Sequence, residues 1–373
     1  MKDILLKSLG ITLLLLIGWE LQAQPNQRQK IIDSLKKRVA IEKSDTLQNQ
    51  LWLKVAQQMY MYSADSLRFY AEKALKVAQR HNYVVGEGKA LSYIGLAYYS
   101  KRELDKSIDY QQKALKLLLK TNDEKAKATT LNNLGMVYYS RTNYEKSLDY
   151  YLQSMRIEEK INNKQGLAGS YGNVGMVLGK LNQHQKALSY YEKAYKIARE
   201  VGHVQYIMQI GHSLSLKYME LKKLDLAQAY ADSALMVAQK LKMPFGVAMT
   251  KGQKGAVLLK QKKFEEAKEN LDDAYAIFEK MGDKMNQMAV LINMANVWQN
   301  LKKYDQMETT SNKALNLAKQ LKIKEQISQA YLNLYRSQKG QKRFEKALES
   351  FEMHKTYNDS VFNDNTTKQL AEM

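Results

Sequence analysis

The sequence predicts an all-α fold, an α-α superhelix (solenoid) of about eight helical hairpins with an N-terminal capping helix. The chain has 373 residues, more than the roughly 250–300 at which a single hydrophobic core stops growing. It contains only 2 prolines and no cysteine, so long helices can form with little interruption. A pattern of small side chains also returns every 40 residues, which is typical of stacked repeats.

Residues 1–23 resemble an export signal. Lys2 and Lys7 flank the start, an apolar run extends from Leu9 to Trp19, and Ala23 offers a small residue for cleavage. The run is shorter than the ~20 residues that a membrane-spanning helix needs. We expect cleavage after Ala23, with an uncleaved anchor as the alternative. The expected location is therefore the periplasm or cell envelope, and no integral membrane span is expected in the mature chain.

Residues 24–46 are expected to cap the first repeat. Residues 28–44 have an amphipathic pattern that places Ile31, Ile32, Leu35 and Val39 on one face. A solenoid needs such a helix, because the apolar surface of its terminal repeat would otherwise face water.

Eight repeats are predicted over residues 47–357. A first column of small residues falls at Val55, Gly95, Gly135, Gly175, Ser215, Gly255, Ala295 and Tyr335, with Val55 and Tyr335 as the two larger exceptions. A second column comprises Ala74, Ala114, Ser154, Ala194, Ala234, Ala274, Ala314 and His354, and a third comprises Leu67, Ser107, Ser147, Ala187, Ala227, Ala267, Met307 and Ala347. Small side chains at fixed places on two successive helices let their backbones approach closely, as an antiparallel helix pair requires.

A larger side chain opens the second helix of most hairpins. It is Leu104, Tyr144, His184, Leu224, Phe264, Tyr304 or Phe344, and aromatic residues follow at Tyr110, Tyr150, Tyr151, Tyr190, Tyr191 and Tyr230. This arrangement resembles the tetratricopeptide repeat. The family's common period is ~34 residues, so each copy here has ~6 more, and the usual proline after the second helix is missing. Both departures match the longer-repeat branch of the family, which resembles kinesin light chain and bacterial peptide-receptor arrays.

The repeat pattern stops after Tyr357. Residues 358–373 resemble the junction in the exported sensory region of bacterial signalling proteins that contain these repeats. In those relatives a coiled helix, a membrane span and an output domain follow. The alternative is a final capping helix.

The formal net charge is +20. Removal of residues 1–23 leaves it unchanged, because Lys2 and Lys7 are balanced by Asp3 and Glu20. In an exported protein this charge favours lipid headgroups, cell-wall polymers or an acidic protein as partners, and we expect no nucleic acid. The lysines are scattered over every repeat, so a solvated surface is the simpler interpretation.

No constellation of catalytic residues is visible. No two of the 5 histidines are four residues apart, no serine lies on a GxSxG turn, and no cysteine is present. The stretch from Val85 to Ala90 lacks the GxxxxGK[ST] spacing of a phosphate-binding loop. We therefore expect no metal, no cofactor and no enzymatic activity.

In arrays of this family the first helices line a concave groove that holds the ligand. Two residues before the small column stand Tyr93, Asn133, Asn173, Ser213, Gln253, Asn293 and Asn333. Such amides can bond the backbone of an extended peptide; the alternative is that they bond neighbouring helices. Tyr99 and Tyr139 would add adaptable contact area, or be partly buried in the core. His212 lies on the same helix face, and its column has no lysine, so a clamp for a peptide carboxylate is not expected. The predicted groove residues are Tyr93, Tyr99, Asn133, Tyr139, Asn173, His212, Asn293 and Asn333.

The resemblance implies a non-catalytic scaffold that binds a protein or peptide in this groove. We expect it to be the extracytoplasmic sensory or adaptor part of a signalling system with a membrane-associated partner. A free-standing envelope scaffold or assembly protein is the alternative, and a hydrolase with an unrecognised site is a remote one.

A reporter enzyme fused to residues 1–30 tests the location. We expect activity outside the cytoplasm, because residues 1–23 have the charge and apolar pattern of a signal. The same fusion with Leu13→Lys and Leu15→Lys should stay inside. Cytoplasmic retention of the unmodified fusion would contradict the predicted export.

Overall fold

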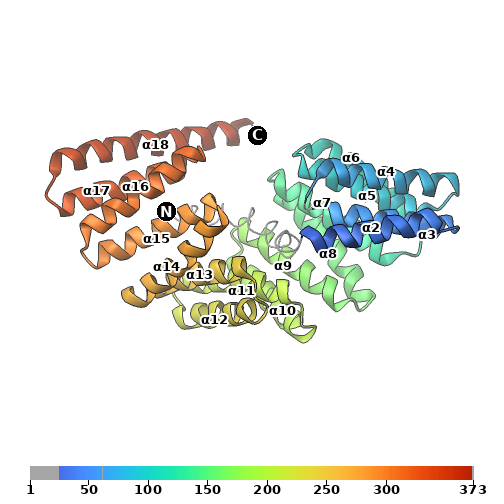
Figure 1. Ribbon diagram of the computed structural model, residues 1–373, viewed down its shortest axis with the longest axis horizontal. Helices are drawn as coiled ribbons and strands as arrows, with labels where there is room; N and C mark the ends of the chain where they lie inside the picture. The colour runs from blue at the N-terminus through green and yellow to red at the C-terminus, as the bar shows by residue number, and fades with distance from the viewer. Residues whose placement is uncertain (1–24, 61, 372–373) are drawn as a thin grey trace. The chain divides into compact units, whose positions relative to one another are not determined.

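The computed structural model describes residues 25–60 and 62–371. The expected export signal at residues 1–23 lies outside the described residues, as do the last two residues of the tail. Within the described ranges the regular structure is entirely α-helical (Figure 1). The all-α prediction is confirmed.

The helices pair as hairpins of nearly constant length. They are α2 (Pro25–Ile41), α3 (Asp45–Met59), α4 (Ala64–Arg80), α5 (Val84–Ser100), α6 (Leu104–Leu118), α7 (Glu124–Ser140), α8 (Tyr144–Lys160), α9 (Lys164–Lys180), α10 (His184–Glu200), α11 (Val204–Glu220), α12 (Leu224–Lys240), α13 (Pro244–Lys260), α14 (Phe264–Met281), α15 (Lys284–Asn300), α16 (Tyr304–Gln320), α17 (Lys324–Gly340) and α18 (Phe344–Ala371). The odd-numbered helices from α3 onward are the first helices of the hairpins, and the even-numbered ones are the second helices.

The chain divides into two units, an N-terminal unit up to residue 210 and a C-terminal unit from residue 211. From α3 to α10 and from α12 to α18, each helix packs against the next one along the chain. Successive first helices also touch, α3 with α5 and α5 with α7 in one unit, α13 with α15 and α15 with α17 in the other. Each unit is therefore a stack of hairpins in which one layer is formed by first helices.

The hairpins nest because small residues lie where the two helices cross. A Cβ atom on Gly135 would lie 2.7 Å from Cδ1 of Tyr151, so the tyrosine ring occupies the space that a side chain would need. The Ser147 hydroxyl donates to the carbonyl of Gly135 at 2.8 Å. The predicted packing role of the second column is confirmed, because Ala74, Ala114, Ser154, Ala194, Ala234, Ala274 and Ala314 are all buried.

The helices stop without proline. At the end of α13, the amide of Lys263 donates to the carbonyl of Leu258 at 2.9 Å, and Lys262 before it has a φ of 63°. This six-residue bond around a left-handed residue is the Schellman arrangement. Equivalent turns recur along both units, so the backbone itself supplies the stop signal that proline gives in shorter repeats.

The two ends of the described chain differ in part from the predicted pattern. In the first hairpin Val55 is fully buried at the predicted position, and Ala56 beside it packs with Leu67 and Ala71. The capping helix α2 packs on α3 and buries Ile32 and Val39, whereas Ile31 on its predicted apolar face is exposed. At the other end α18 continues through Tyr357 to Ala371, and the first part of the tail is therefore a continuation of the last second helix.

None of the described helices is long and apolar enough to cross a membrane.

Gly135→Ala tests the nesting of the hairpins. We expect the free energy of unfolding to fall by about 1–3 kcal/mol, because the added methyl meets the buried Tyr151 ring. Gly252→Ala is the matched control, since its Cβ would lie 3.6 Å from the nearest atom, in Val290. The control should be neutral or stabilising by up to about 1 kcal/mol. Urea unfolding followed by circular dichroism measures both, and equal effects would contradict the proposed crossing geometry.

Candidate functional site

The amide column predicted on the first helices links neighbouring first helices in the N-terminal unit. Asn133 of α7 donates from Nδ2 to the Ser92 hydroxyl of α5 at 3.1 Å. Ser92 in turn donates to Oε1 of Gln111 at 2.8 Å, and Nε2 of Gln111 donates back to the carbonyl of Ser92 at 2.9 Å. All three side chains are buried. Asn133 is therefore part of a closed polar network and is not open to a ligand.

The next asparagine of this column, Asn173, is more accessible to solvent. Asn173 of α9 donates from Nδ2 to Oδ1 of Asn132 of α7 at 2.8 Å, and both side chains are half-buried. Asn132 was not among the predicted residues. It lies three residues before Gly135, in the same column as His212, so the column that the sequence singled out through a histidine also contains the accessible amide.

Around Asn132 lies a surface that we call the first-helix face. It comprises Thr129, Asn132 and Met136 of α7 with Gly172 and Met176 of α9, each exposed or half-buried. A Cβ on Gly172 would have only ordinary contacts, 3.6 Å from Ile210. Two adaptable thioethers thus lie one helical turn beyond a polar amide and a position without a side chain. This combination suits a peptide backbone lying along the helices.

The three predicted tyrosines are largely withdrawn from this surface. Tyr99 is buried, and its hydroxyl lies 2.9 Å from the Ser140 hydroxyl. The hydroxyl of half-buried Tyr139 has no hydrogen-bond partner among the described residues. Burial raises its pKa far above the ordinary value, and the nearby Tyr144 and Tyr99 add to the shift. Tyr93 packs beside the cores of the first two hairpins, and burial raises its pKa as well.

In the C-terminal unit the predicted site residues are not joined to one another by hydrogen bonds between described residues. Asn333 is buried, accepts from Gln329 at 3.3 Å, and keeps Nδ2 without a partner among the described residues. Asn293 is half-buried. Nδ1 of His212 is also buried without a described partner, and burial lowers the pKa of its imidazole to about 4. His212 is therefore neutral at physiological pH.

Sequence reasoning missed a buried carboxyl group at the end of α8. Glu158 occupies a column that is otherwise apolar wherever it is buried, with Ala78, Leu118, Ala198, Ala238, Phe278 and Ala318 as its equivalents. Its carboxyl carbon lies 2.4 Å from the position that a Cβ on Gly166 would take, so the carboxyl group fills the space that the glycine leaves. Oε2 has no hydrogen-bond partner among the described residues. Burial raises the pKa of this carboxyl, although a hydrogen bond from Asn163 and the charge of Lys125 oppose the shift.

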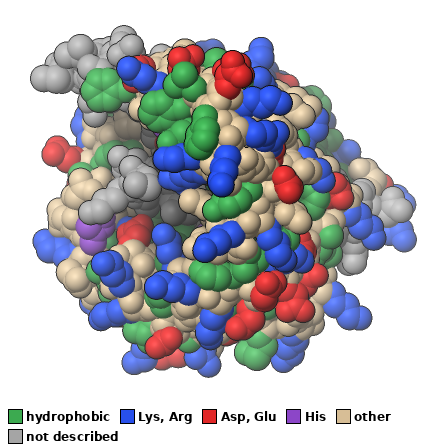
Figure 2. Space-filling model, turned by 90° about the vertical axis from the view of Figure 1, so that its left-hand side faces the viewer, with side chains coloured by type: hydrophobic (Ala, Val, Ile, Leu, Met, Phe, Trp, Pro, Cys, Tyr) green, Lys and Arg blue, Asp and Glu red, His purple; other side chains and the backbone are tan. Residues whose placement is uncertain are grey.

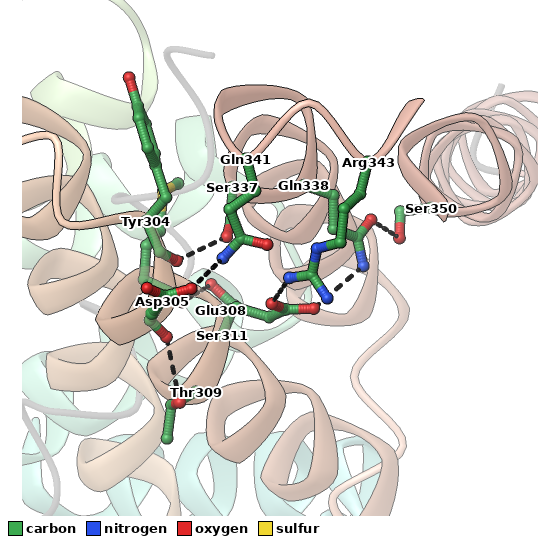
Figure 3. A network of polar contacts seen from close by, with 11 residues as sticks. Tyr304, Asp305, Glu308, Thr309, Ser311, Ser337, Gln338, Gln341, Arg343 and Ser350 are labelled. Atoms are coloured by element: carbon green, nitrogen blue, oxygen red, sulfur yellow. Dashed lines mark hydrogen bonds and ion pairs between the residues drawn. The ribbon is translucent and has the colours of Figure 1, made fainter. Parts of the chain in front are cut away.

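A second polar network joins α16, α17 and α18 (Figure 3). Glu308 pairs with Arg343, and Nε2 of Gln338 donates to Glu308 at 3.5 Å. Ser350 donates to Oε1 of Gln338 at 2.8 Å. Burial acts to raise the pKa of Glu308, but the hydrogen bonds, led by that from Arg343, outweigh it and lower the pKa. This network holds the last hairpin to the one before it.

The charged side chains on the surface shown in Figure 2 do not gather into a patch that would indicate a binding site. Figure 2 shows lysine and arginine side chains scattered over one face, with acidic side chains among them. Within the described residues no group of three or more His, Asp or Glu side chains could hold a metal ion. The first-helix face is therefore the best-defined candidate.

Comparison with known proteins supports the repeat assignment. The family model for the tetratricopeptide repeat matches residues 86–160 and 126–200. No curated protein matches the sequence.

Several solved structures share the fold at low sequence identity. A signal transduction ATPase with numerous domains and a tetratricopeptide repeat sensor, from Pyrococcus horikoshii, matches with TM-score 0.65 and 15% identity over 91% of this chain and 53% of that one. Aspartyl phosphate phosphatase F from Bacillus subtilis matches with TM-score 0.60 and 16% identity over 94% of both chains. A Rap protein complexed with competence and sporulation factor matches with TM-score 0.58 and 15% identity over 96% and 99%. The chain spans about half the length of the ATPase, and at these identities the likeness shows the fold alone.

Two carboxyl groups should affect stability in opposite directions with pH. The raised pKa of Glu158 means that its protonated form is favoured in the folded state, so its contribution is present at low pH and lost as pH rises through the folded pKa. Glu158→Gln should then raise the free energy of unfolding at pH 8 by about 1 kcal/mol and have little effect near pH 4.

Glu308→Gln is the matched comparison. Its lowered pKa means that the ionised form is favoured in the folded state, so its contribution is present at neutral pH and lost as pH falls. This variant should be destabilised at pH 8 by about 1–2 kcal/mol. Urea unfolding at both pH values measures the two effects, and the same sign for both variants at pH 8 would contradict the assignments.

Proposed function

Because the chain is a tetratricopeptide-repeat protein, we propose that it is a non-catalytic scaffold that binds a protein or an extended peptide on its first-helix face. The observation that carries the proposal is the half-buried Asn132 amide on the first-helix face, one helical turn from Met136. Its Oδ1 accepts from Asn173, which fixes the amide plane and orients Nδ2 as a donor. A donor held in this way can bond a peptide carbonyl whatever the peptide's side chains are.

The flanking residues favour a ligand of mixed sequence. Methionine side chains are flexible and polarisable, so they can pack against different apolar groups. Gly172 leaves room for the ligand backbone beside α9. The Rap protein of similar fold was solved in complex with competence and sporulation factor, and we propose by analogy that the ligand here is also a peptide or a protein segment.

We further propose that binding takes place outside the cytoplasm, as part of a sensory or adaptor function in signalling. The support is the export pattern of residues 1–23 together with the resemblance of residues 358–373 to a sensory junction. The same binding surface would serve a free-standing envelope scaffold. A pull-down from detergent-solubilised envelopes separates the two roles. A sensor should retain a membrane-associated partner, and a free-standing scaffold should not.

The test is binding of an array of random-sequence decapeptides, followed by titration of the best binder. Asn132→Ala combined with Met136→Ala should weaken that peptide by about tenfold or more. Lys116→Ala, on the exposed surface of the second helix α6, is the matched control and should leave affinity unchanged. Asn133→Ala should lower the free energy of unfolding by about 1 kcal/mol instead, because it opens the buried bond to Ser92. Equal affinity of the double variant, or no binder in the array, would overturn the proposal.

A further inference from the structure

The last hairpin exposes apolar side chains at positions that are half-buried or buried in most of the other hairpins. Phe344, Leu348 and Phe351 of α18 are 66%, 59% and 42% exposed, and they lie on one side of the helix, at intervals of four and three residues. At the place of Phe351 in the earlier hairpins stand Ala71, Gln111, Tyr151, Tyr191, Ala231, Leu271 and Ser311, each at most 7% exposed. The exposure at the end of the stack is therefore specific to this hairpin.

The first helix of the last hairpin contributes to this exposure. Tyr335 stands where Gly135 allows Tyr151 to nest. The rings of Tyr335 and Phe351 lie 5.2 Å apart, tilted by 50°. Because an aromatic ring already fills the crossing point, Phe351 cannot sink between the helices.

Inside the stack, the side of each second helix that corresponds to the exposed side of α18 is covered by the first helix of the following hairpin. An acidic residue near the start of the second helix takes part in that contact. Asp105 near the start of α6 pairs with Arg141 at 2.9 Å, and Asp305 near the start of α16 accepts from Gln341 at 2.8 Å. Glu345 has the same place on α18. It has no ion pair with any described residue, and neither do Glu349 and Glu352, which are also exposed. We call Phe344, Leu348, Phe351, Glu345, Glu349 and Glu352 the end face.

The other end of the chain has the complementary character. Helix α2 buries Ile32 and Val39 on α3 but leaves Ile31 and Ile41 43% and 80% exposed. Lys30, Lys37 and Arg38 are exposed on the same helix and form no ion pair within the described part of the chain. Helix α2 is thus an amphipathic helix with an apolar and basic outer side, whereas the end face is apolar and has three glutamates, with the exposed Lys355 one turn beyond Phe351.

We propose that α2 of one copy of this chain lies on the end face of a second copy, so that the chains associate head to tail. Helix α2, which packs on α3 as a second helix packs on the next first helix, would cover the side of α18 that a following first helix covers inside each unit. The three cations of α2 would neutralise the three glutamates of the end face. Such an interface is heterologous, because it joins two different surfaces, and it leads to rings or open filaments rather than a closed dimer.

Sedimentation velocity of the purified chain over a wide concentration range tests the proposal. We expect the average mass to rise with concentration in low salt and the association to weaken in 0.5 M NaCl, because the charges are exposed. Reversing the end face with Glu345→Lys, Glu349→Lys and Glu352→Lys should weaken association by at least about tenfold. Reversing α2 with Lys30→Glu, Lys37→Glu and Arg38→Glu should do the same.

The decisive variant contains both sets of reversals in one chain. It should associate again, since the opposite charges then face each other with exchanged signs. Circular dichroism is expected to be unchanged in all three variants, because every altered side chain is exposed. A wild-type chain that stays monomeric at all concentrations would overturn the proposal. It would also be overturned if reversal of α2 left association intact, which would point to pairing of two end faces, or if the combined variant failed to recover.

Discussion

The whole stack depends on the distance at which two helix backbones can cross. Where Gly135 meets Tyr151, and where Gly255 meets Leu271, a Cβ atom would lie 2.7 and 2.6 Å from the neighbouring side chain. Contacts that close leave no room for even one methyl group. Where a serine stands at such a crossing, its hydroxyl bonds the opposite backbone, as Ser107 does to the carbonyl of Gly95, so the hydroxyl is satisfied without added volume. The position of the first-helix face follows from these crossings, because they fix how each first helix is turned.

Much of this architecture could be predicted from the sequence, because side-chain volume is a property of each residue and needs no partner to be recognised. The alanine column and the hairpin spacing follow directly from the places where the helices cross. The first hairpin shows the limit of this reasoning. Val55 is fully buried at the predicted position, but Ala56 beside it is also fully buried and packs with Leu67 and Ala71, a core contact that the 40-residue period did not indicate.

The candidate site was harder to predict for a different reason. An asparagine can donate toward a ligand or toward the next helix, and its residue type is the same in both cases. Asn133 and Asn132 are neighbours in sequence, yet the first is enclosed by Ser92 and the second lies on the surface. Only the rotation of α7 separates them. Glu158 could have been noticed as a carboxyl in an otherwise apolar column, but its lack of a partner for Oε2 depends on the three-dimensional surroundings.

The turns between helices bear on how the charge of the protein should be understood. Lys222, Lys242, Lys262, Lys302, Lys322 and Lys342 all occupy the left-handed position that ends a helix, where glycine would be conformationally easier. Each places a positive charge beside the carbonyl end of a helix, whose partial charge is negative. Part of the basic character thus compensates the peptide dipoles of the chain's own helices at these six bends. A high isoelectric point in such a protein is to that extent a by-product of having many helix ends, and says correspondingly less about which molecule it meets.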